Sequence, residues 1–240
     1  MNRIAIKFHN DGTQPLTITA ATLKSNFFDN DFIWGPGRSA TLSPGFAIDL
    51  RVDIPSVDSC DEARPENSLR FDWRVGKVSG TSVVIPKDTY GILERLHDDG
   101  CFIAAMNTVA TMTAVSLTPP AEKQTPATLL ISIAPTGEKG TLTVDSVGSS
   151  TLLRPADSAG IGSAKLDLGV VINANGPREI TIPIVPNRCD AHGLAEDKVG
   201  TRIPLFVTLP DGTKGRFVLP ASDLLRAAIY SFYTSFCGLG

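Results

Sequence analysis

The sequence contains little that would support catalysis or metal binding. Only three of its 240 residues are histidines, and its four cysteines form no CxxC pair and no Cys/His set with the spacing of a zinc site. A nucleophile elbow, a phosphate-binding loop, a dinucleotide-binding fingerprint, an HExxH helix and an EF-hand loop are all absent. We therefore expect no catalytic residues, no metal, no cofactor and no enzymatic activity.

The sequence also lacks a large excess of positive or negative charge, and it lacks long apolar runs. Lys and Arg number 22 against 25 Asp and Glu, which gives a net charge of −3 and no basic field for nucleic acid or an anionic membrane. No run reaches the roughly 18 apolar residues of a membrane helix. Residues 1–7 have a strand pattern rather than the apolar core of a signal peptide, so any leader is absent from the given chain.

Short apolar stretches between turn residues make up most of the chain. The 21 Gly and 17 Pro fall mainly between these stretches, which is typical of a protein with many short strands. Alternating residues 4–8 and 16–19 flank an Asn-Asp-Gly turn and predict a hairpin. Residues 129–133 and 142–144 repeat that pattern and predict a second hairpin.

An internal repeat organises these strands. Residues 54–101 and 182–237 share the order Ile-Pro, Cys-Asp, Glu, strand, Gly-Thr turn, apolar strand and helix, and each copy closes on a cysteine. The turns are expected at Gly80-Thr81 and Gly212-Thr213. The repeat predicts a mainly β protein of two tandem immunoglobulin-like β-sandwich domains, residues 1–107 and 108–240, each with a short C-terminal helix and one disulfide.

Two helix starts and one additional strand complete the predicted architecture. Ser222 is the expected N-cap of the last helix and Gly238 its stop, while Asp88 should cap the helix of the first copy. Residues 109–117 predict a strand, which we assign to the second domain. Because no such strand precedes residue 4, we expect the first domain to lack its first strand and the natural chain to extend upstream of residue 1.

The cysteines fall two per repeat, as Cys60 and Cys101, then Cys189 and Cys237. Four cysteines allow three connectivities, and the duplication favours pairing within each copy. Free buried thiols and a metal site are the alternatives. Since disulfides persist in oxidising compartments, we expect an extracytoplasmic protein, either secreted or at the cell surface.

Two stretches are candidate partner-binding sites. Phe27, Phe28, Phe32 and Trp34 would form a carbohydrate- or protein-binding patch if exposed, and would fill the open end of a sandwich if buried. His192 and Glu196 belong to a charged segment that follows Cys189. That segment is either a ligand site at one end of the sandwich or a structured loop whose charges pair locally.

Two segments resemble known proteins. Residues 10–19 look like the opening of many bacterial immunoglobulin-like domains. The segment RCDAHGLAEDKVGT, residues 188–201, is similar to segments of uncharacterised exported actinobacterial proteins with tandem immunoglobulin-like domains. That resemblance extends over the whole chain and implies a membrane anchor or lipoprotein signal in a longer form. It implies no activity and no functional residues.

Together these features favour a non-catalytic cell-envelope protein that binds or scaffolds another envelope component, either a protein or a glycan. An accessory or chaperone-like subunit that captures a partner strand at a sheet edge is the alternative. A hydrolase at the domain junction is the third candidate.

Overall fold

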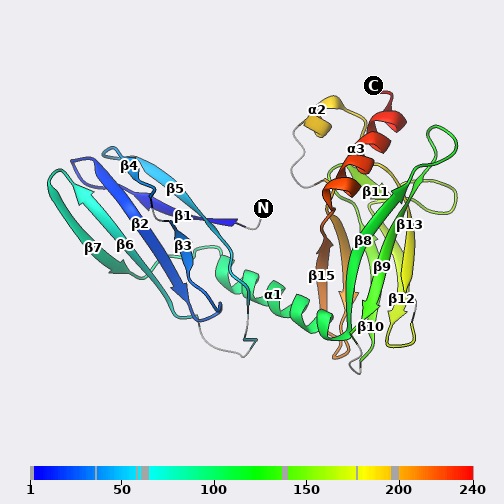
Figure 1. Ribbon diagram of the computed structural model, residues 1–240, viewed down its shortest axis with the longest axis horizontal. Helices are drawn as coiled ribbons and strands as arrows, with labels where there is room; N and C mark the ends of the chain where they lie inside the picture. The colour runs from blue at the N-terminus through cyan, green and yellow to red at the C-terminus, as the bar shows by residue number, and fades with distance from the viewer. Residues whose placement is uncertain are drawn as a thin grey trace. The chain divides into compact units, whose positions relative to one another are not determined.

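The computed structural model describes residues 3–35, 37–57, 59–60, 65–136, 140–176, 178–195 and 200–239. The chain forms two compact units, Met1–Cys101 and Phe102–Gly240. Each unit consists of antiparallel strands in two sheets, which confirms the predicted mainly β fold class of two tandem sandwiches (Figure 1). The division between the units and the predicted division after residue 107 both fall within one helix, α1 (Ile92–Val109).

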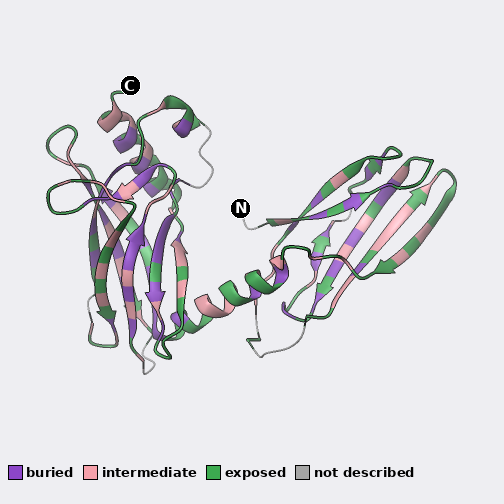
Figure 2. Ribbon diagram, turned by 180° about the vertical axis from the view of Figure 1, so that it is seen from behind, coloured by how far each residue is buried: buried purple, intermediate pink, exposed green. Residues whose placement is uncertain are grey.

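The first unit pairs β1 with β5 in one sheet and orders the other sheet β3-β2-β6-β7, with β4 also paired to β2. Its strands are β1 (Arg3–His9), β2 (Leu16–Ser25), β3 (Phe32–Trp34), β4 (Ala40–Leu42), β5 (Ala47–Asp53), β6 (Asn67–Val75) and β7 (Val78–Val84). All pairs are antiparallel. Buried and exposed residues alternate along β1 and β5, as expected for sheets with one face on a core (Figure 2).

The second unit has sheets of order β8-β9-β13-β11 and β12-β10-β14-β15. Its strands are β8 (Ala110–Thr118), β9 (Ala127–Pro135), β10 (Leu142–Gly148), β11 (Leu153–Pro155), β12 (Lys165–Ile172), β13 (Glu179–Pro186), β14 (Ile203–Thr208) and β15 (Lys214–Leu219). The short helix α2 (Ala191–Ala195) follows β13, and α3 (Asp223–Cys237) follows β15.

The internal repeat is visible in the strand pairing. β1 pairs with β5 as β9 pairs with β13, and β2-β6-β7 has the same order as β10-β14-β15. The main addition in the second unit is β8, which pairs with β9 in the position that we assigned to residues 109–117. β8 therefore belongs to the second unit, as predicted.

The predicted hairpin between residues 4–8 and 16–19 is wrong, although both strands exist. β1 and β2 lie in different sheets, and so do β9 and β10. The buried side chain of Asn10 fixes the first crossing: its amide nitrogen donates to the carbonyl oxygens of Gln14 (2.9 Å) and Leu42 (3.0 Å), and its oxygen accepts from the Gly12 N–H. Alternation identifies strands but not their partners.

The turn expected at Gly80-Thr81 is also misplaced, because Gly80 lies inside β7. The hairpin between β6 and β7 turns at the two residues between Val75 and Val78, the first of which, Gly76, has φ of +58°. That left-handed conformation favours glycine at the first position of such a tight turn. The corresponding turn in the second unit does include Gly212, with φ of +87°.

The predicted caps of α3 and α1 are confirmed. Ser222 Oγ accepts from the Leu225 N–H at 3.2 Å, and Gly238 ends α3 with φ of +64°. The Asp88 carboxylate accepts from the N–H groups of Ile92 and Leu93 at 2.9 and 2.8 Å. α1 is longer than the short helix that we expected, since it runs for 18 residues and leads directly into β8.

Each unit has its own hydrophobic core, and α1 contributes to both. Leu93 and Leu96 pack in the first core, whereas Met106 and Val109 are buried in the second. In the second unit α3 adds a buried stripe at helical spacing, which consists of Leu225, Ile229, Phe232 and Tyr233. Burial of each such side chain contributes about 1.5–3 kcal/mol.

Both disulfides form as predicted, Cys60 with Cys101 and Cys189 with Cys237, with Cα–Cα distances of 5.6 and 5.3 Å. Each disulfide joins the helix at the end of its repeat to the loop that follows a strand. That strand is β5 for Cys60–Cys101 and β13 for Cys189–Cys237. All four cysteines are therefore structural, and the alternatives of free thiols or a metal site do not hold.

Candidate functional site

The aromatic residues that were candidates for an exposed patch are buried. Phe27, Phe28, Phe32 and Trp34 are at most 8% exposed and belong to the core of the first unit. The Phe28 and Phe32 rings meet edge to face at 4.8 Å between centroids. Their large apolar area favours filling the sandwich, so the interpretation as a partner-binding patch is corrected and the alternative of burial holds.

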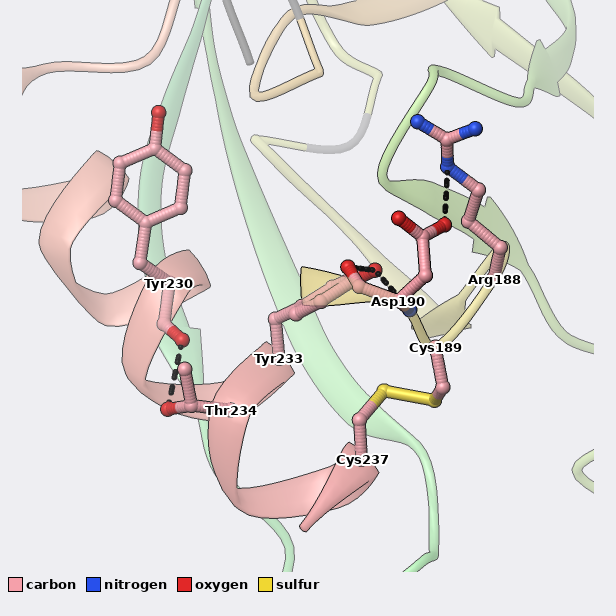
Figure 3. Close-up of a disulfide and its surroundings, with 7 residues drawn as sticks. All are labelled: Arg188, Cys189, Asp190, Tyr230, Tyr233, Thr234 and Cys237. Atoms are coloured by element: carbon pink, nitrogen blue, oxygen red, sulfur yellow. Dashed lines mark hydrogen bonds and ion pairs between the residues drawn. A yellow bond between two sulfur atoms is a disulfide. The ribbon is translucent and has the colours of Figure 1, made fainter. Parts of the chain in front are cut away.

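The segment after Cys189 is braced by local contacts (Figure 3). Arg188 Nε lies 3.0 Å from Asp190 Oδ2, and Asp190 Oδ1 accepts from the Gly193 N–H. The Tyr233 hydroxyl lies 3.3 Å from both the backbone nitrogen and the carbonyl oxygen of Asp190. These contacts, together with the disulfide, fix the loop on α3 and support its structural interpretation.

His192 is exposed on α2, and Glu196 lies outside the described residues. The two candidates therefore remain predictions. His192 belongs to the second unit and the buried aromatic cluster to the first.

His97 is buried on α1 and has a structural position. Its Nε2 lies 2.9 Å from the carbonyl oxygen of Ser59 and 3.6 Å from Cys101 Sγ, and its ring stacks on Phe27 at 4.4 Å between centroids. Since Cys101 is bonded to Cys60, it offers no thiol for His97 to activate. His97 thus joins the cysteine loop, the helix and the core.

Within the part of the chain that the structure describes, no three His, Cys, Asp or Glu side chains group as metal ligands. No helix among those residues is long and apolar enough to cross a membrane.

A further candidate for a binding site is a groove of about 600 Å³ on the first unit. It is lined by residues 4–9 of β1, by one residue each of β2 and β5, by two residues of β6, by the end of β7, and by the residues that lead into and begin α1. Ile6, Phe8, Leu69 and Leu93 line it with side chains that are buried in the first core. Val84, by contrast, is 42% exposed. We call this feature the β1 groove.

One wall of the β1 groove is the edge of a strand. Across the described residues, β1 pairs only with β5, so its other side presents backbone N–H and C=O groups without a strand partner. The inward side chains of β1 are Ile4, Ile6 and Phe8, and its outward positions carry Arg3, Ala5, Lys7 and His9. An edge strand of this kind is a template for another strand.

The second unit has a strand in the position that is open in the first. β8 pairs with β9, and it also contacts β15 and α3. These three neighbours of β8, namely β9, β15 and α3, are the repeat counterparts of β1, β7 and α1, which border the β1 groove. In Figure 1, β8 lies beside β9 and under α3. The β1 groove is therefore the place that β8 would occupy if the first unit had one.

No protein-family model matches the sequence, and no curated protein matches it. Among solved structures, the YadV chaperone aligns with 91% of this chain and 92% of its own chain, at 12% sequence identity and a TM-score of 0.22. So low a TM-score supports neither a shared fold nor a shared function. The function has to be inferred from the chain's own geometry.

None of the residues that line the β1 groove was a candidate from sequence. The sequence does not indicate which side chains line the groove, since these come from five separate strands and the start of α1.

Proposed function

We propose that this chain is a non-catalytic protein of the cell envelope, outside the cytoplasm, that binds a polypeptide by strand addition at the edge of β1. Of the candidate functions, this is the capture of a partner strand by an accessory or chaperone-like subunit. The observation that carries it is the asymmetry of the two units: among the described residues, β9 has strands on both sides and β1 on one.

The shape and chemistry of the groove favour a polypeptide over a glycan. A row of backbone donors and acceptors along one wall is satisfied by an extended chain, and the apolar floor receives alternate side chains of such a chain. Trp34 and its neighbours, the candidates for a glycan-binding patch, are buried. Strand addition thus accounts for both the edge and the floor.

Two further observations support the proposed extracytoplasmic location and the proposed lack of catalysis. Two disulfides are typical of proteins that fold in an oxidising compartment. His97, the one buried histidine among the described residues, is engaged by Ser59, Cys101 and Phe27. We propose that the hydrolase alternative is not the function.

Site-specific photo-crosslinking tests this proposal in cells. A photoreactive residue at Ala5, which is exposed and lines the groove, should crosslink to a protein. The same residue at Val78, exposed at the opposite end of β7 and outside the groove lining, is the control and should not. No protein adduct at Ala5, or equal adducts at both positions, would contradict strand addition at β1.

A further inference from the structure

We infer that the β1 groove takes a strand that runs antiparallel to β1, with small to medium apolar side chains at alternate positions and acidic side chains on its outward face. The inference rests on the proposed function and specifies the chemistry of the partner. Its template is β8, the strand that fills the equivalent place in the second unit.

β8 defines the direction and the apolar face. It is antiparallel to β9, with Ala110 opposite Pro135 and Thr118 opposite Thr128. Its inward residues are small or unbranched at Cβ and are all buried: Ala110, Met112, Ala114 and Leu117. Because the β1 groove has the same three kinds of neighbour, a strand with this pattern would place its apolar side chains on Leu69, Phe71 and Leu93.

The outward face differs between the two units. In the second unit, the outward residues of β8 are mainly threonines, and those of β9 carry no charge. In the first, Arg3 and Lys7 of β1 lie opposite Asp53 and Asp49 of β5, Ala5 lies opposite Arg51, and Arg3 Nε lies 2.5 Å from Asp53 Oδ1. Because β1 presents Arg3 and Lys7 outward, acidic residues on a strand beyond it would have opposite charges as cross-strand neighbours.

The same charges decide against a second copy of the chain as the occupant. Antiparallel pairing of β1 with β1 of another copy would bring two cationic faces together, since the outward positions of both carry Arg3 and Lys7. Like charges directly opposite one another destabilise a strand pair. A partner strand with acidic outward residues has the opposite effect.

The probe is a synthetic peptide with the sequence of residues 110–118, ATMTAVSLT. We expect it to bind the full chain and to protect the β1 amides from hydrogen exchange. A peptide with aspartate at the positions of Met112 and Ala114 should bind at least about tenfold more weakly, because it would bury unpaired charge. Glutamate at the positions of Thr111 and Thr113 should strengthen binding about two- to fivefold at low salt, and Lys7→Gln should remove that gain.

Substitutions in the protein provide matched controls. Val84→Asp places a charge in the groove and should weaken binding at least about tenfold. Val83→Asp, on the neighbouring and more exposed residue outside the groove lining, should leave binding unchanged within about twofold. Tyr90→Asp, at a groove position that is 80% exposed, is the second groove variant should Val84→Asp unfold the protein.

Several results would overturn the inference. These are equal binding of the apolar and aspartate peptides, protection of β3 or β7 instead of β1, concentration-dependent dimers that exclude the peptide, and a longer form of the chain that fills its own groove. A protein crosslink at Ala5 combined with no peptide binding would overturn the partner chemistry and leave the proposed function standing. Peptide binding without that crosslink would overturn the proposed function and leave the partner chemistry standing.

Discussion

Gly80 and Trp73 show how a single missing side chain shapes the first unit. They lie directly opposite each other on β7 and β6, and a Cβ at Gly80 would come within 2.9 Å of the Trp73 ring. The indole covers the glycine and donates from Nε1 to Ser82 Oγ at 2.9 Å. The glycine in β7 is thus required by packing against the ring rather than by a turn.

We predict that Gly80→Ala destabilises the protein by about 1–3 kcal/mol, because the ring has to move to admit the methyl group. Gly35→Ala is the control, since a Cβ there meets nothing within 4 Å, and it should change stability by less than about 0.5 kcal/mol. Urea unfolding followed by tryptophan fluorescence measures both. Equal stability of the two variants would contradict the packing role.

At the scale of elements, the start of α1 depends on one carboxylate. Asp88 lies ahead of the helix and accepts two of the N–H groups that its first turn leaves without intrahelical partners. The negative charge also lies at the positive end of the helix dipole. Since the start of α1 borders the β1 groove, this cap also positions one wall of the candidate site.

We predict that Asp88→Ala lowers the free energy of unfolding by about 1 kcal/mol. Asp88→Asn, which keeps an acceptor oxygen, should lose less. Asp99→Ala, at an exposed position on the same helix, serves as the control and should have little effect. Chemical denaturation of the three variants gives the comparison, and an equal loss at Asp88 and Asp99 would count against the cap.

Prediction from sequence succeeded for features that nearby residues determine. Ser222, Gly238 and Asp88 were identified as caps because capping depends on a few neighbouring residues. The hairpins were wrong because residues 4–8 pair with a strand more than 40 residues later, a choice that depends on the whole sandwich. The β1 groove was missed for the same reason: it arises from strands that are far apart in sequence.

At the scale of the whole molecule, the two disulfides stabilise different units. Cys60–Cys101 closes a separation of 41 residues in the first unit and Cys189–Cys237 one of 48 in the second. In the chain-entropy model, each such crosslink stabilises its unit by roughly 4 kcal/mol. Both tryptophans, Trp34 and Trp73, belong to the first unit, so their fluorescence reports that unit alone.

We predict that Cys60→Ser with Cys101→Ser lowers the urea midpoint seen by tryptophan fluorescence. Cys189→Ser with Cys237→Ser should instead lower the midpoint of a transition seen by circular dichroism and leave the fluorescence midpoint in place. If both double variants shift the fluorescence midpoint equally, the two units unfold as one block and the assignment of each disulfide to its own unit's stability fails.

The direct passage from α1 into β8 has a consequence for folding kinetics. The two units offer similar edges, β1 and β9, and β8 has a pattern suited to either. Once formed, α1 is a continuous helix of 18 residues, about 27 Å long, that passes into β8 without an intervening loop. Helices form faster than sandwiches assemble. Early formation of α1 would thus favour the pairing of β8 with β9 and disfavour a misfolded state in which β8 pairs with β1.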